Sequence, residues 1–310
     1  MIAFKEYDEQ LKILKEKGMI IADELYAKKI LESNTYYNFI NAYKDIFIDK
    51  TASTEKYLAG TSFEHILALW NFDKYLRLEV LRCANIVERI FKSKVMHVFS
   101  RHFGTDISIY LNINNFHIHK QQQAKKLIDE IMTGYKKRIA NGDPMLCHYR
   151  KKQCTPFWVL INTFSFRQVV ALYEYSKSSI QSEISKELFS LTGKKVLPHE
   201  IINQAQIINL FRNNAAHDQR IYMLSPRNQL SANHVTSIHL KAINGTRGLF
   251  SFICSLYSFF ESDVYSLFIG SLKRNWQKLA DGLENNAYLL ALIEQKTRFS
   301  SNWDSLEDIE

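Results

Sequence analysis

The segment that decides the fold covers residues 61–103 and reads TSFEHILALWNFDKYLRLEVLRCANIVERIFKSKVMHVFSRHF. Large apolar side chains recur in it at steps of three, four or seven residues, which gathers them on one face of an α-helix. These residues are Ile66, Leu69, Phe72, Leu76, Val80, Val87, Phe91 and Val95. Thr61 or Ser62 can cap the start of the helix, and a loop that contains Gly104 follows it. The segment therefore predicts one long helix.

The composition favours an all-helical chain. The 310 residues include 10 Gly and 4 Pro, where average usage gives roughly 22 and 15. So few turn-forming residues cannot supply the many tight turns of a β-sandwich or barrel. Helical spacing or end signals predict further helices at residues 7–18, 23–33, 120–140, 156–175, 179–191, 198–218, 235–260 and 264–292. Residues 34–47 fit either a helix or an extended chain, and residues 49–60 are polar enough for a loop.

We therefore expect an all-α fold, a multi-helix bundle that forms a single large domain over residues 1–296. The chain has no internal repeat and no linker long enough to divide it in two. Residues 297–310 are acidic and are expected to fray from the end of the domain. The three tryptophans Trp70, Trp158 and Trp276 are expected in the core.

Charge and cysteine usage point to a cytoplasmic protein with a polyanionic partner. The formal net charge is +8, which suggests RNA or another polyanion. The four cysteines form no CxxC pair, so we expect reduced thiols. The apolar run at residues 249–260 is too short to span a membrane, and the charged first residues do not resemble a signal peptide. No membrane association is expected.

The middle of the chain carries the clearest basic cluster. Its members are Lys136, Lys137, Arg138, His148, Tyr149, Arg150, Lys151 and Lys152. Cations can follow an RNA backbone while aromatic rings stack on unpaired bases. The same residues could equally form an ordinary solvated helix face. The nearby stretches FHIHK and MLCHY match no standard zinc spacing, so neither a metal nor another cofactor is expected.

Residues 210–220, LFRNNAAHDQR, carry the strongest candidate chemistry. On a helical wheel, Arg212 falls in the middle of an apolar stripe, where a guanidinium is costly unless it is paired or faces a polar cleft. Asn213, His217 and Arg220 share a neighbouring face. Arg212 and His217 lie about 140° apart at about 100° per residue. They therefore converge only through the length of the arginine or through a second copy of the helix.

These residue types suit RNA cleavage without a metal. When the ribose 2′-OH attacks the adjacent phosphate, an arginine can stabilise the growing negative charge with two hydrogen bonds. A histidine can move a proton near neutral pH, and Asn213 can orient the phosphate or the imidazole. Two other interpretations remain open: an RNA-binding module without catalysis, and a polar seam of a dimer. An Arg and a His at this spacing also occur by chance, and Arg227 with His234 satisfies a similar, looser pattern.

The motif RNNAAHDQR resembles the R-N-x-x-x-H signature of HEPN domains, helical modules that commonly act as RNases after dimerising. The wider chain resembles the Abi family of bacterial abortive-infection proteins. The likeness covers four stretches: YYNFINAY, SFEHILALWNFDKYLRLEVL, HYRKK with PFWVLINTFSFRQVVALY, and LFRNNAAHDQRIY. The sequence departs from the family pattern at three positions: Lys74 replaces an arginine, Arg167 replaces a glycine, and Asp218 stands where a second histidine is frequent.

The resemblance implies a HEPN-like bundle with additional helices and a homodimer whose two motifs face a shared cleft. Carried over to this sequence, it assigns Arg212, Asn213 and His217 as catalytic residues, with Asp218 and Arg220 in support. Asp218 could raise the basicity of the neighbouring imidazole or repel RNA phosphates. The implied role is growth arrest by RNA cleavage during phage infection, and the implied partners are substrate RNA and, in some relatives, a small structured regulatory RNA.

Overall fold

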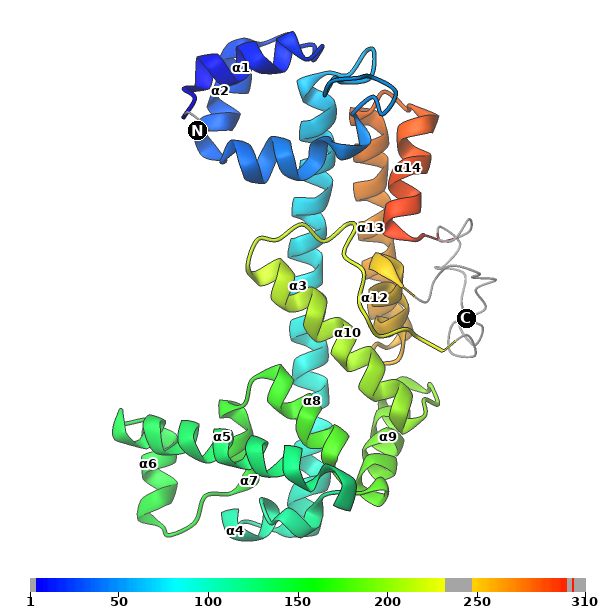
Figure 1. Ribbon diagram of the computed structural model, residues 1–310. Helices are drawn as coiled ribbons and strands as arrows, with labels where there is room; N and C mark the ends of the chain where they lie inside the picture. Colours follow the sequence, from blue (N-terminus) through cyan, green and yellow to red (C-terminus); the bar gives the residue numbers. More distant parts are fainter. Residues whose placement is uncertain (1–3, 232–246, 300–302, 304–310) are drawn as a thin grey trace.

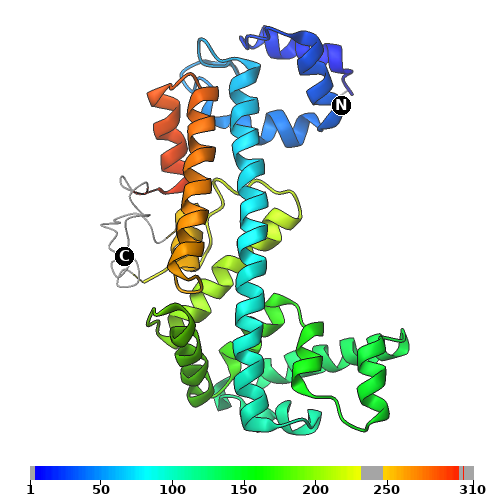
Figure 2. The same cartoon turned by 180° about the vertical axis from the view of Figure 1, so that it is seen from behind.

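The computed structural model describes residues 4–231, 247–299 and 303. Over these residues the protein is an all-α single domain, as the sequence predicts, with isolated β-bridges and no named strand. Helix α3 (Phe63–Phe103) is the axis of the molecule, and the other helices pack along its length (Figures 1 and 2).

Helix α3 forms where its apolar spacing predicts. The Ser62 hydroxyl accepts a hydrogen bond from the backbone N–H of His65 at 3.3 Å, and the His65 Nδ1 accepts one from the backbone N–H of Ser62 at 3.3 Å, which satisfies two free N–H groups at the start of the helix. Gly104 ends the helix with a φ of +67°. Every apolar residue of the predicted stripe is buried, so α3 supplies the central surface of the core.

Three groups of helices surround α3 (Figure 1). The end at which α3 begins is covered by α1 (Tyr7–Glu16), α2 (Glu24–Ser33), short π- and 3-10 turns at Tyr37–Asn41 and Lys44–Ile46, and α14 (Ala287–Thr297). Helix α13 (Ser262–Gly282) runs along α3 from its beginning to its middle, and the middle is also covered by α10 (Pro198–Ala216) and α12 (Gly248–Tyr257). The other end carries α4 (Ile107–Tyr110), 3-10 turns at Ile113–Asn115 and Ile118–Lys120, α5 (Gln121–Ala140), α6 (Pro144–Lys151), α7 (Phe157–Leu160) with a 3-10 turn at Ile161–Thr163, α8 (Phe166–Tyr175) and α9 (Ser178–Thr192).

The helix expected at residues 264–292 is two helices, α13 and α14. The chain turns between them because Glu284 and Asn285 adopt positive φ angles of 54° and 55°, which ordinary helices exclude. The Asn286 side chain then caps α14 by accepting a hydrogen bond from the Leu289 N–H at 3.2 Å. A strong cap so soon after the first helix favours a new start over continuation.

Helix α6 was not among the predicted helices. The sequence pattern indicates a break at residues 141–144, which the structure contains. The Asp143 carboxylate accepts hydrogen bonds from the backbone N–H groups of Met145 and Leu146, each at 3.2 Å, and Pro144 occupies the first turn. Pro at the first position and Asp before it are both favourable for starting a helix. The break therefore also marks a helix start.

Two predictions near the end of the chain fall partly outside the described residues. Of the helix expected at residues 235–260, the structure describes α12 and not residues 232–246. Of the tail at residues 297–310, it describes residues 297–299 and 303: Thr297 is the last residue of α14, and Trp303 is buried against Trp276 and Phe299. The domain boundary at residue 296 stays a prediction.

Lys194, in the connection between α9 and α10, gives the stability a pH dependence. Its Nζ donates a hydrogen bond to the Phe260 carbonyl at 2.8 Å and lies 3.8 Å from the ring centroid of Tyr257. Burial lowers the pKa of this amine from 10.5 to about 8. Between these two values the unfolded chain binds more protons than the folded chain, so raising the pH across that window favours the folded state.

We expect Lys194→Met to remove this contribution. Between pH 7.5 and 9.5, wild type should gain about 1 kcal/mol of unfolding free energy relative to Lys194→Met. Urea unfolding of both proteins at the two pH values measures the difference. The exposed neighbour Lys195 provides the control, since Lys195→Met should follow wild type at both pH values. An unchanged gap between wild type and Lys194→Met would contradict the low pKa.

Candidate active site at the end of helix α10

Helix α10 ends two residues earlier than predicted, and its end is sharply defined. The Asp218 N–H donates to the Ala215 carbonyl at 3.2 Å, and the Gln219 N–H donates to the Asn214 carbonyl at 2.9 Å. This pair of bonds is a Schellman motif, in which the residue after the C-cap adopts a left-handed conformation. Asp218 holds that position with a φ of +54°. His217 is therefore the C-cap of the helix and not part of its regular face.

Arg212 is half-buried and makes no ion pair within the described residues. Its Nη1 donates a hydrogen bond to the Asn213 Oδ1 at 3.2 Å. Its Nε is buried without a hydrogen-bond partner in this part of the chain. Because a buried guanidinium N–H without an acceptor is costly, this arrangement leaves donor capacity available to an added acceptor.

His217 and Arg220 lie beyond the last turn of α10. The His217 side chain is exposed and forms no hydrogen bond or ion pair with the described residues. The guanidinium carbon of Arg220 lies 6.0 Å from the ring centroid of Tyr222, and one of its terminal nitrogens is buried without a hydrogen-bond partner among those residues. The motif thus presents an accessible imidazole and two partly unsatisfied guanidinium groups within nine residues of sequence.

A buried carboxylate fixes the chain immediately after the motif. Asp73 of α3 is fully buried and accepts hydrogen bonds from the backbone N–H groups of Tyr222 at 2.7 Å and Ile221 at 3.1 Å. It also accepts from the Tyr43 hydroxyl at 2.6 Å and pairs with Arg77 Nη1 at 2.6 Å. Burial raises the pKa of the Asp73 carboxyl, while the Tyr43 hydrogen bond and the Arg77 charge act in the opposite direction.

Arg77 connects this buried cluster to the motif itself. Its Nε lies 2.8 Å from the Asp218 Oδ1, and its Nη1 also donates to the Tyr43 hydroxyl at 3.1 Å. The Arg77 side chain is 6% exposed and that of Asp218 is 83% exposed, so the ion pair extends from the core to the surface. The Asp218 carboxylate is thus paired with Arg77, and the position that departs from the family pattern anchors the end of α10 to α3.

Tyr43, Asp73 and Arg77 support the candidate site, and the sequence interpretation missed them. The signal was available, because Asp73 and Arg77 are four residues apart and lie among the apolar positions of α3. Burying a charge costs free energy, which is why Arg212 was singled out. The cost is larger for Asp73 and Arg77, because their side chains are almost completely buried. Ile221, which donates to Asp73, lies 148 residues away in sequence, and Asp218, which pairs with Arg77, lies in the same distant segment, so only the folded structure shows what they hold.

The predicted RNA-binding residues lie elsewhere, on an arm formed by α5 and α6 toward the other end of α3 (Figure 1). The side chains of the predicted RNA-binding residues are exposed, except that Tyr149 is half-buried. Four of the cations form neither an ion pair nor a ring contact within the described residues: Lys136, Lys137, Arg150 and Lys151. Arg138 lies 3.5 Å from Asp143, and Lys152 lies over the Tyr149 ring at 5.8 Å. The structure therefore contains two separate candidate regions for RNA: the motif at the end of α10 and the basic arm formed by α5 and α6.

Three further observations concern metal ligands, membrane spans and the second Arg-to-His match. The described part of the chain contains no group of three or more His, Cys, Asp or Glu side chains placed to hold a metal ion. Among the described helices, none combines the length and the apolar character needed to cross a bilayer. The second Arg-to-His match ends at His234, which lies outside the described residues.

Comparison with known proteins identifies the family. The model of the family described as Abi-like protein matches residues 29–223, more than half of the chain. This range contains the α10 motif together with Tyr43, Asp73 and Arg77. No curated protein and no solved structure matches the chain significantly. From the extent of the family match, we conclude that the chain belongs to the Abi-like protein family.

Proposed function

We propose that this protein is a metal-independent endoribonuclease of an abortive-infection system, with Arg212, Asn213 and His217 as its catalytic residues. Membership of the Abi-like family supports the abortive-infection role. The enzymatic proposal rests on a contrast at the C-terminal end of α10, between a fixed backbone and side chains without partners. The backbone after the motif is fixed by Asp73, whereas the Arg212 Nε and the His217 imidazole have no partner among the described residues.

The proposed reaction is an internal transesterification of RNA. His217 accepts the proton of a ribose 2′-OH as the 2′ oxygen attacks the neighbouring phosphorus. Arg212 donates hydrogen bonds to the phosphoryl oxygens as their negative charge grows, and Asn213 orients the Arg212 side chain through the 3.2 Å contact. The bond from phosphorus to the 5′ oxygen breaks, and that oxygen takes up a proton. The products are a 2′,3′-cyclic phosphate and a 5′-hydroxyl.

The active form in this proposal is a homodimer. Arg212 lies just before the last turn of α10 and His217 is its C-cap, so the two side chains leave the chain in different directions. Two copies of the helix end, placed face to face, bring the arginine of one copy toward the histidine of the other. The exposed Ala216 has a short side chain and permits a close approach of the partner helix.

The nature of the RNA ends tests the reaction directly. In a buffer with excess EDTA, we expect the protein to cut single-stranded RNA at an undiminished rate and to leave 2′,3′-cyclic phosphate and 5′-hydroxyl ends. Denaturing gels with end-specific enzymatic treatments identify these ends. The matched control is the same oligonucleotide with 2′-deoxyribose at the cleaved positions, which should stay intact because it lacks the nucleophile. Cleavage that needs a divalent metal, or that cuts the deoxy substrate, would refute the mechanism.

A second candidate function is RNA binding without cleavage, in which the protein holds a structured small RNA. The unpaired cations on α5 and α6 favour it, because Lys136, Lys137, Arg150 and Lys151 are exposed and have no carboxylate partner among the described residues. Binding through such cations weakens steeply as salt rises, with a slope that reports the number of phosphates contacted. Salt-sensitive binding of RNA that remains uncut in the EDTA experiment identifies this second function.

A further inference from the structure

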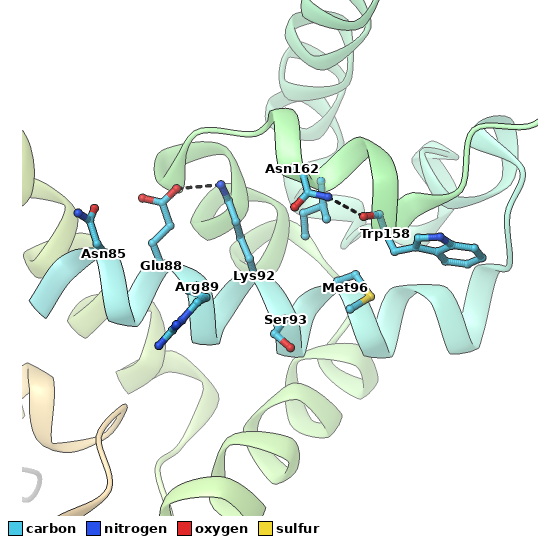
Figure 3. A pocket seen from close by; sticks show the side chains of 9 residues that line it. Asn85, Glu88, Arg89, Lys92, Ser93, Met96, Trp158 and Asn162 are labelled. Carbon is cyan, nitrogen blue, oxygen red and sulfur yellow. Dashed lines mark hydrogen bonds and ion pairs between the residues drawn. The ribbon is translucent and has the colours of Figure 1, made fainter. Parts of the chain in front are cut away.

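A cavity of about 400 Å³ lies on α3, away from the α10 motif (Figure 3). Helix α3 contributes Asn85, Glu88, Arg89, Lys92, Ser93 and Met96 to its lining. The segment formed by α7 and the following 3-10 turn contributes Trp158, Ile161 and Asn162. The volume falls in the range of pockets that hold small organic ligands.

Trp158 is the aromatic surface of this cavity, and its position corrects the prediction that it is a core residue. Its side chain is 42% exposed. The reason is the geometry of the short helix α7, in which Phe157, Val159 and Leu160 are buried and leave Trp158 on the outer side. In Figure 3 the indole lies above the α3 surface near Met96. An exposed indole with one apolar neighbour offers a flat face for stacking.

The polar groups of the cavity are arranged so that one cation stays available. Lys92 Nζ pairs with the Glu88 carboxylate at 2.8 Å, and both side chains are about four-fifths buried. Arg89 is exposed and makes no ion pair within the described residues. The Asn162 amide nitrogen donates to the Trp158 carbonyl at 2.8 Å, so its amide oxygen remains free to accept a hydrogen bond. A ring, a cation and an acceptor therefore surround one cavity.

We propose that this cavity binds one unpaired nucleotide of a single-stranded RNA. The base stacks on Trp158, an exocyclic amino group of the base donates to the Asn162 oxygen, and Arg89 binds the adjacent phosphate. The inference rests on the proposed function for its RNA ligand, and it adds a stacking subsite remote from the motif. An anionic strand is favoured over a neutral ligand because Arg89 in the lining has no ion-pair partner among the described residues, and the exposed cations Arg150, Lys151 and Lys152 lie a few residues before α7 in the sequence.

The proposed nucleotide subsite and the candidate catalytic motif lie at different positions along α3. Arg89 lies twelve positions after Arg77, which anchors the motif, a rise of about 18 Å along a helix. One RNA strand that contacts both regions must therefore extend over several nucleotides. The subsite consequently contributes to how tightly the strand is held and not to the bond-breaking step.

Binding to the His217→Ala chain tests the proposal without interference from cleavage. The probe is a fluorescently labelled single-stranded RNA of mixed sequence, with a double-stranded RNA of equal length and free AMP as parallel arms. We expect Trp158→Ala and Arg89→Ala each to weaken single-strand binding on the order of 10-fold. Trp158→Phe should retain most of the affinity because it keeps a ring. Bound RNA should quench tryptophan emission in the parent chain and not in Trp158→Phe.

Arg82→Ala is the matched control for charge. Arg82 lies seven residues before Arg89 on the same helix, is exposed, and pairs with Glu79 at 2.8 Å. It should leave the affinity within twofold of the parent. Unchanged single-strand affinity in both Trp158→Ala and Arg89→Ala would overturn the proposal. Quenching by free AMP without single-strand binding would overturn it in favour of a free-nucleotide site. None of these binding measurements requires cleavage. The result can therefore be interpreted even if the protein is not an endoribonuclease.

Discussion

Replacing Asp73 with alanine is expected to lower the free energy of unfolding by roughly 3–5 kcal/mol. The carboxylate is fully buried and accepts from two backbone N–H groups, one hydroxyl and one guanidinium. Removing it leaves the Arg77 charge and the N–H groups of Ile221 and Tyr222 without this acceptor in a region that water does not reach. Urea unfolding followed by circular dichroism measures the loss, provided that the slope with denaturant is unchanged.

Two variants test whether this loss belongs to the cluster. Asp8→Ala removes a carboxylate that is exposed and pairs with Lys28 at 2.8 Å, and it should leave the unfolding midpoint nearly unchanged, since exposed pairs contribute little. Asp73→Asn keeps one acceptor oxygen while removing the charge, so its loss should fall between those of wild type and Asp73→Ala. If Asp73→Ala unfolds at the same urea concentration as Asp8→Ala, the cluster does not stabilise the site.

The helical architecture was predictable because its determinants are local. The apolar spacing of α3, the Ser62 cap and Gly104 lie within or next to the helix that they define. The same holds for α10, whose Pro198 start follows from its own sequence. The two-residue error at its end arose because Asp218 adopts a left-handed conformation that glycine usually occupies. An aspartate there gives a weaker sequence signal for a helix end than a glycine does.

The supporting structure of the candidate site was not predictable in the same way. The hydrogen bonds that fix Ile221 and Tyr222 come from Asp73, almost half the chain away. Trp158 illustrates the related problem of short helices. With one turn and apolar residues on most positions, the α7 sequence does not indicate which side faces the core. The structure decides it through Phe157 and Leu160, which are buried. Hydrogen-bond partners that are distant in sequence and helices of a single turn are therefore the features that the sequence does not predict.

Replacing His217 with alanine is expected to reduce the rate of RNA cleavage by about 10²–10⁴-fold, the usual contribution of one general acid or base. The substitution should leave folding unaffected, because the His217 side chain is exposed and forms no hydrogen bond or ion pair with the described residues. Single-turnover cleavage of an end-labelled RNA, measured beside urea unfolding of the same preparations, separates a loss of chemistry from a loss of structure.

The control for this variant is at the opposite end of the same helix. His199 is exposed in the first turn of α10, so His199→Ala removes an equivalent imidazole far from the motif and should cleave at the wild-type rate. Arg212→Ala should match His217→Ala in its loss, because the two groups act on one phosphodiester and their effects do not add. Equal cleavage by wild type and His217→Ala would remove the histidine from the mechanism. Equal loss in His199→Ala would point to helix α10 as a whole and not to its C-terminal end.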